Sequence, residues 1–233
     1  MTLFGLAATL TSAMLLAGSA LAADQTILGK ILVIKDPSPG GDPAKRSTVA
    51  VGKETDSPNT IVGDPTTIGT TLILIANGTH PSIQVFLLPQ GLDANGEPFW
   101  RATKKGFKYR DAKGEQGPVK VVIFEKAATL TFIIKAVVLG KLGPLDVLPP
   151  NAGTDGFVVL DIAGGDRYCI QFGADGIVEN HAAQLFKVKS VDAQGCPTIL
   201  STTTTSTSIT TPTSTSSTTT TTLIGSPSGV FLD

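Results

Sequence analysis

Short runs of β-branched and apolar residues, separated by glycine- and proline-rich segments, recur along the chain as far as Val191. Within Gly106–Asp111, aromatic and charged residues alternate, and a period of two places them on opposite faces of a strand. We therefore expect about ten strands. They are Ile27–Lys35, Ser47–Lys53, Thr70–Ala76, Ile83–Leu88, Gly106–Asp111, Val119–Lys126, Thr129–Val138, Phe157–Ile162, Gly165–Gly173 and Leu185–Val191.

The segments between these runs favour turns and loops. Asp36–Pro43 holds three prolines and two glycines, and Gly140–Asp155 is of the same kind. No stretch shows a convincing helical period. Short strands joined by such turns predict an all-β fold, an antiparallel β-sandwich. Lys30–Glu54 and Gly106–Lys126 share a faint pattern, which indicates either two related β units or two hairpins of similar composition.

The two ends of the chain differ from its centre. Leu3–Leu16 is apolar, and Ala20-Leu21-Ala22 forms an A-x-A cleavage site, which together predict export although no Lys or Arg precedes the run. A tract of almost only Ser and Thr near the other end has no apolar face to bury. The predicted parts are a signal peptide (1–22), a β-sandwich domain (23–199), a disordered Ser/Thr-rich stalk (200–222) and a C-terminal tail (223–233).

Charge and cysteine content limit the partners and the cellular compartment that we expect for this protein. Eighteen basic and 19 acidic residues give a formal net charge of −1, which suggests neither nucleic acid nor an anionic membrane as a partner. No apolar stretch after the signal peptide is long enough to span a bilayer. Two cysteines in an exported chain predict a disulfide between Cys169 and Cys196. We expect a secreted, extracellular or cell-surface protein, with the periplasm as a further option.

The strand around Cys169 predicts where that disulfide lies. Tyr168, Ile170 and Phe172 alternate with Arg167, Cys169 and Gln171. With the first three side chains in the core, Cys169 faces outward beside polar neighbours. The bridge would then be an exposed clasp, and its loss would loosen the residues beyond Val191 without unfolding the domain.

Aromatic residues offer one candidate binding site. Phe99 and Trp100, the only tryptophan, fall in an irregular segment, and Tyr109 follows nearby. Exposed rings of this kind stack on sugar faces, so the three residues are a candidate carbohydrate site, with a polysaccharide or another cell-surface component as the partner. The alternative is that Trp100 fills the core, as a single tryptophan commonly does.

Metal and catalytic chemistry have weaker signals. Asp155, Asp166 and Asp175 lie in glycine-rich segments and are candidates for a structural calcium ion, while no other cofactor is expected. His80 and His181 lie too far apart in sequence to indicate zinc. No G-x-S-x-G motif is present. A pair of glycosidase carboxylates stays open, although most aspartates fall in turns.

Several short motifs occur together along the chain. They are Asp42-Pro43 with Lys45-Arg46, Gly63-Asp64-Pro65-Thr66, Gly106–Asp111, Gly117-Pro118-Val119-Lys120, Tyr168-Cys169 and Cys196-Pro197. With these motifs the chain resembles a group of uncharacterised secreted β-rich proteins of environmental Gram-negative bacteria, which often carry Thr-rich tracts. The resemblance covers most of the chain between Lys30 and Pro197. It implies export and a β fold, and no activity.

Three functions fit this description, in order of preference. The first is a non-enzymatic surface or extracellular protein that acts by binding or assembly. The second is a carbohydrate-binding module anchored on Trp100. The third is a secreted glycoside-active enzyme. The sequence contains no signature that identifies a ligand.

Overall fold

A computed structural model of the chain describes residues 22–150, 152–173, 178–181, 183–189, 195–198, 200–203 and 221–224. It is built almost entirely from strands, which confirms the predicted all-β fold. The strands are β1 (Asp24–Lys35), β2 (Ser47–Glu54), β3 (Thr70–Gly78), β4 (Ser82–Leu88), β5 (Trp100–Thr103), β6 (Gly106–Arg110), β7 (Val119–Lys126), β8 (Phe132–Leu139), β9 (Gly153–Ile162), β10 (Arg167–Phe172), β11 (Val178–His181), β12 (Leu185–Val188), β13 (Leu200–Thr203) and β14 (Thr221–Ile224).

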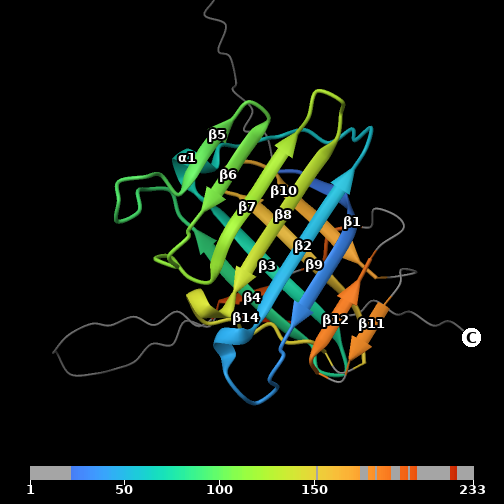
Figure 1. Cartoon of the computed structure of the whole chain (residues 1–233). Coiled ribbons are helices and arrows are strands. Elements are labelled where there is room, and N and C mark those ends of the chain that lie inside the picture. Colours follow the sequence, from blue (N-terminus) through green and yellow to red (C-terminus); the bar gives the residue numbers. More distant parts are fainter. Residues whose placement is uncertain are drawn as a thin grey trace, which may run out of the picture.

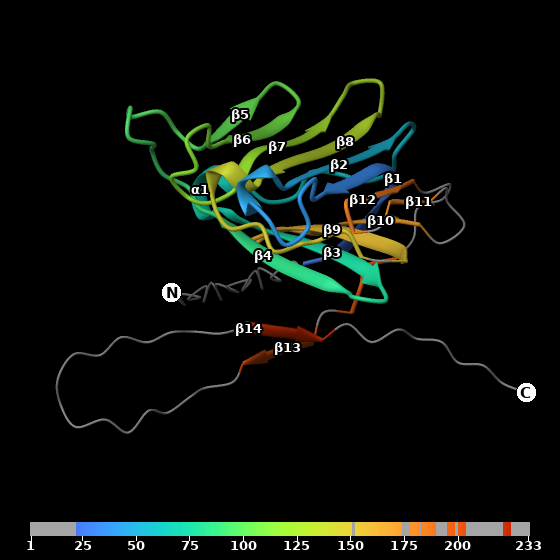
Figure 2. The same ribbon diagram turned by 60° about the horizontal axis from the view of Figure 1, so that its bottom comes forward.

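One sheet runs through most of these strands in the order β4-β3-β9-β10-β1-β2-β8-β7-β6-β5. It curls back on itself into two layers that cross at an angle (Figures 1 and 2). The first layer holds β4, β3, β9, β10 and the start of β1. The second holds the end of β1 with β2, β8, β7, β6 and β5, while β12 pairs with the other side of β1 and β11 with β12.

Strand β1 joins the two layers. Its first residues pair with β10 in parallel, and its last residues pair antiparallel with β2 and β12, with an irregularity between Gly29 and Ile31. The crossing needs a residue without a side chain, because a Cβ on Gly29 would lie 2.2 Å from the carbonyl oxygen of Gln171. The parallel β1–β10 pair departs from the purely antiparallel sandwich that the sequence predicted.

The core lies between the layers, and Tyr168 connects them. This side chain comes from β10 in the first layer, and its ring centroid lies 4.6 Å from that of Phe124 and 5.7 Å from that of Phe132, both in the second layer. All three rings are fully buried. Aromatic contacts of this kind add to the stabilisation from buried apolar area.

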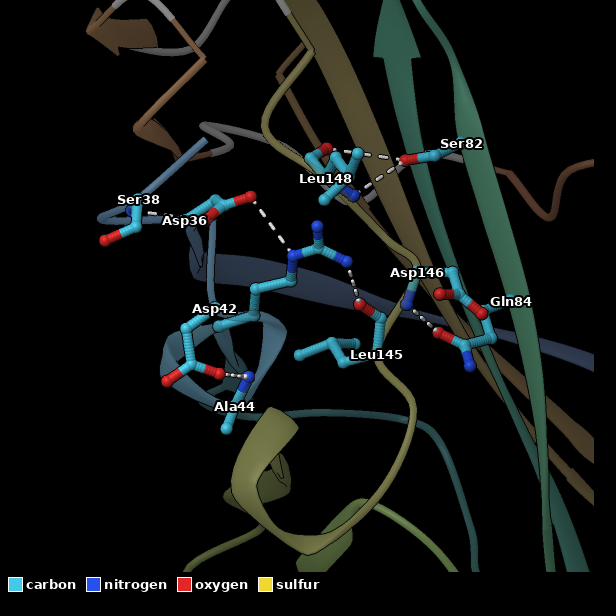
Figure 3. Close-up of polar contacts among 10 residues, drawn as sticks. Asp36, Ser38, Asp42, Ala44, Ser82, Gln84, Leu145, Asp146 and Leu148 are labelled. Atoms are coloured by element: carbon cyan, nitrogen blue, oxygen red, sulfur yellow. Dashed lines mark hydrogen bonds and ion pairs between the residues drawn. The ribbon is translucent and has the colours of Figure 1, made fainter. Parts of the chain in front are cut away.

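An extended segment, 143–150, covers one open side of the sandwich, where the sequence predicted a loop. Leu145 and Val147 are buried in the core. The segment is held by side chains from other elements (Figure 3). Gln84 of β4 accepts a hydrogen bond from the Asp146 amide (2.8 Å), and Arg46 donates one to the Leu145 carbonyl oxygen (3.1 Å).

Local differences from the predicted elements have identifiable causes. The strand predicted at Thr129–Val138 begins only at Phe132, because Leu130 adopts a left-handed turn conformation with φ of 56°. A single helical turn that the sequence did not indicate, α1 (Pro65–Ile68), is capped by the Asp64 side chain. The described residues also include two short 3₁₀ turns, η1 (Pro43–Lys45) and η2 (Gly140–Leu142).

Some expectations fall at the ends of the chain. The predicted signal peptide lies outside the described residues except for Ala22. Within the predicted stalk and tail, β13 and β14 pair antiparallel, and the other residues lie outside the description. The division of the chain into signal, domain, stalk and tail, and the idea of two related β units, stay predictions.

Candidate ligand-binding groove

The three aromatic residues proposed to stack on sugars lie together, but in the core. Tyr109 packs against Phe99 and Trp100, with ring centroids 6.0 and 5.3 Å apart. The three side chains are 1 to 3% exposed, and the Trp100 indole donates a hydrogen bond to the Leu88 carbonyl oxygen. Burial raises the pKa of Tyr109. The expectation of exposed rings was therefore wrong, and these side chains offer no stacking surface.

The aspartates proposed to bind calcium do not converge. Asp155 lies near the start of β9, whereas Asp166 follows its end, so about 20 Å of strand separates them. Asp155 accepts hydrogen bonds from Asn77 and Thr154, and Asp166 accepts them from Ala23 and Gln25. Asp175 lies outside the described residues. Among the described residues, no group of three or more His, Cys, Asp and Glu could hold a metal ion.

Cys169 and Cys196 form the predicted disulfide. Cys169 does point away from the main core, as the alternation in β10 predicted, but it is fully buried. It belongs to a second apolar cluster on the outer face of the first layer, with Ile73 and Val159, against which Cys196 packs. The expected exposed clasp is therefore corrected to a buried one, because the segment at Cys196 lies over this face.

A shallow groove of about 570 Å³ opens where three loops meet at one end of the second layer. Its basic side chains are Lys104 and Lys105, in the β5–β6 turn, and Lys126, at the end of β7. The turns of the β5–β6 and β7–β8 hairpins lie at this same end (Figure 1). The lining is mostly apolar between the lysines, and its other members are Thr60, Ile61, Ala127, Ala128 and Leu130.

Hydrogen bonds from Tyr168 and Gln25 hold the loop that carries Thr60 and Ile61. The Tyr168 hydroxyl accepts a hydrogen bond from the Val62 amide (2.7 Å) and donates one to the Thr60 carbonyl oxygen (2.9 Å). Burial raises the pKa of Tyr168 to about 12. Gln25 of β1 accepts from the Thr60 amide (2.8 Å), so the core and the first strand together fix this side of the groove.

The Lys126 ammonium bridges the groove. It comes from β7 and donates a hydrogen bond to the Asn59 carbonyl oxygen (2.5 Å), in the loop on the opposite side. Asn59 in turn donates to the Thr26 carbonyl oxygen (2.7 Å) and to Glu54 (2.9 Å). Among the described residues, neither Lys104 nor Lys105 forms a salt bridge. Two cations are thus available to a ligand beside one that is held in place.

The groove lies within a strongly basic part of the chain. The segment from Trp100 to Lys135 holds nine basic and three acidic residues, a formal charge of +6, while the rest holds nine and sixteen, a charge of −7. On the outer face of the second layer Arg101 lies directly opposite Lys108, a like-charge pair that destabilises a sheet. Arg101 is paired with Glu97, whereas Lys108 forms no salt bridge among the described residues.

The sequence did contain a signal for this region that the net charge of −1 concealed. Lys104-Lys105, Lys108 and Arg110 fall within seven positions, and a charge count over short windows would have detected them. A charge count could not have shown that Lys104 and Lys105 line a groove together with Thr60 and Lys126, because this depends on the arrangement of three loops.

Within the described part of the chain, no helix is both long and apolar enough to cross a membrane.

Comparisons with family models, with curated proteins and with solved structures found nothing that matches this chain.

Proposed function

We propose that this protein is an exported, non-enzymatic binding protein whose groove, lined by Lys104, Lys105 and Lys126, takes an acidic polysaccharide. The observation that carries the proposal is an open groove lined by three lysines, in a stretch of the chain whose formal charge is +6 while the rest is acidic. A shallow groove with an apolar floor and cationic rim suits a sugar chain, whose ring faces are apolar and whose carboxylates project sideways.

Nucleic acid, another polyanion, is less well matched to this surface than an acidic polysaccharide. Proteins that bind single-stranded nucleic acid stack bases on exposed aromatic rings. The aromatic residues near the groove, Trp100, Tyr109 and Phe124, are buried, and Phe107 is partly buried against the core. Export, which the A-x-A motif and the disulfide favour, would place the protein where acidic polysaccharides occur.

The test is binding of the purified chain to fluorescent polygalacturonate, with neutral dextran and duplex DNA as alternative ligands. We expect saturable binding to polygalacturonate that weakens as salt rises, and none to dextran. Lys104→Ser with Lys105→Ser should weaken binding about threefold to tenfold, because each exposed ion pair contributes roughly 0.2 to 1 kcal/mol.

A matched control removes the same charge elsewhere. Lys45 and Lys141 are exposed and lie in η1 and η2, so Lys45→Ser with Lys141→Ser should leave affinity unchanged. An equal loss in both double variants would mean that net charge and not the groove governs binding. Equal or tighter binding to DNA would overturn the assignment to polysaccharide.

A further inference from the structure

The buried carboxylate of Asp166 accepts hydrogen bonds from residues at the start of β1. Asp166, in the β9–β10 turn, is 7% exposed. One carboxylate oxygen accepts a hydrogen bond from the Ala23 backbone nitrogen at 3.0 Å, and the other accepts one from the Gln25 side chain. The Ala23 carbonyl oxygen accepts a further bond from the Arg167 amide at 2.9 Å, so Ala23 is held on both sides.

Within the described part of the chain, this carboxylate has no cationic partner. Among the described residues Asp166 takes part in no salt bridge, and the adjacent Arg167 is paired instead with Asp24. A carboxylate removed from water and given only neutral donors is costly compared with one that has a charged partner. The arrangement therefore has a position for one positive charge, at the nitrogen of Ala23.

We propose that Ala22–Ala23 is a proteolytic processing site, and that cleavage there creates the ammonium group that pairs with Asp166. Both residues are exposed, and Ala22 is the last residue of the A-x-A motif. A leader-removing protease catalyses hydrolysis of the peptide bond: water supplies the oxygen that leaves Ala22 with a carboxylate, and the Ala23 nitrogen departs as an amine that is protonated at neutral pH.

The consequence is that processing stabilises the folded protein. Before cleavage, Ala23 gives Asp166 a hydrogen bond from a neutral amide. After cleavage, the same nitrogen at the same place gives a charged one, which is the stronger kind. The start of the first strand would thus be held more strongly in the processed chain than in the unprocessed one.

The first measurement is the intact mass of the exported protein, which should correspond to a chain that begins at Ala23. The second compares thermal unfolding of the full processed chain with that of the same chain carrying an acetylated N-terminus, and with a chain that begins at Ser19. We expect the midpoint to be about 3 to 5 °C lower in both altered forms, because each removes the charge from this nitrogen.

Two carboxylate variants test whether Asp166 is responsible. In Asp166→Asn, acetylation should no longer lower the midpoint. In Asp24→Asn, which alters the exposed neighbouring carboxylate, acetylation should act as in the unaltered chain. A different first residue, an equal midpoint for free and acetylated chains, or an acetylation effect that persists in Asp166→Asn would each overturn the proposal.

Discussion

The outer faces of the two layers differ although both follow the same alternation of inward and outward residues. On the first layer, outward-facing Val159 and Cys169 are fully buried, because the segment at Cys196 lies against them. On the second layer, outward-facing Ile123 and Lys135 stay partly exposed, and Lys108 is exposed. Alternation therefore predicts the side of the sheet on which a residue lies, but the segment linked through Cys196 decides whether the part of that side around Cys169 meets solvent.

The largest expected effect comes from placing one charge on each outer face. Val159→Lys should lower the free energy of unfolding by about 3 to 5 kcal/mol, because it buries an unpaired ammonium. Ile123→Glu, at a partly exposed position directly opposite Lys108 and Lys135, should cost less than about 1 kcal/mol, because the carboxylate can reach water and faces two cations. Urea denaturation measures both. Similar losses would contradict the distinction between a covered and an open face.

Removing the disulfide should uncover the first face. Cys169→Val with Cys196→Ala releases a bridge that spans 27 positions, and the chain-entropy relation gives a loss of roughly 3.5 kcal/mol. We expect lower global stability, together with faster proteolysis beyond Lys189. If only the proteolysis changed, the bridge would be an external tether after all, as the sequence alone suggested.

Tyr168 allows a test of the face of the first layer that is turned toward the core. It is the neighbour of Cys169 in β10, and its side chain points into the core between the two layers. Tyr168→Phe removes the hydroxyl that bonds Thr60 and Val62, which should cost about 1 to 3 kcal/mol. The pKa of Tyr168 is raised to about 12 in the folded protein. The contribution of its neutral hydroxyl to stability should therefore be fully present below pH 10 and should be lost as the pH rises through 12.

The alkaline loss measured by urea titration should be smaller in Tyr168→Phe than in the unaltered protein. Part of it should remain, because the pKa of Tyr109 is raised as well. An unchanged pH profile would show that Tyr168 does not titrate with the fold.

The smallest effect concerns the like charges on the second face. Lys108→Glu turns the opposed Arg101–Lys108 pair into an attractive one and should raise stability by about 0.5 kcal/mol at low salt, with no gain at 1 M salt. Affinity for polygalacturonate should fall in the same variant. Higher stability with unchanged affinity would indicate that this face does not take part in binding.

The sequence predicted those features that depend on neighbouring residues. Gly106–Arg110 and Ser47–Glu54 form strands within a residue of the predicted bounds, because the alternation of residues specifies them locally. The parallel pairing of β1 with β10 was not predicted, since nothing in either segment records the partner. The groove was missed for the same reason, and Trp100 was misplaced because burial depends on packing against β4 and β6.

The pairing of β1 with β10 also bears on the order of folding. The two strands are joined by contacts that span 143 positions, as between Gln25 and Tyr168. Contacts so distant in sequence form slowly, because a long loop must close before they contribute. Strand β1 therefore has no partner in the first layer until β10 has been synthesised. A chain of this design stays unfolded for longer during synthesis, which is the state in which exported chains commonly cross a membrane.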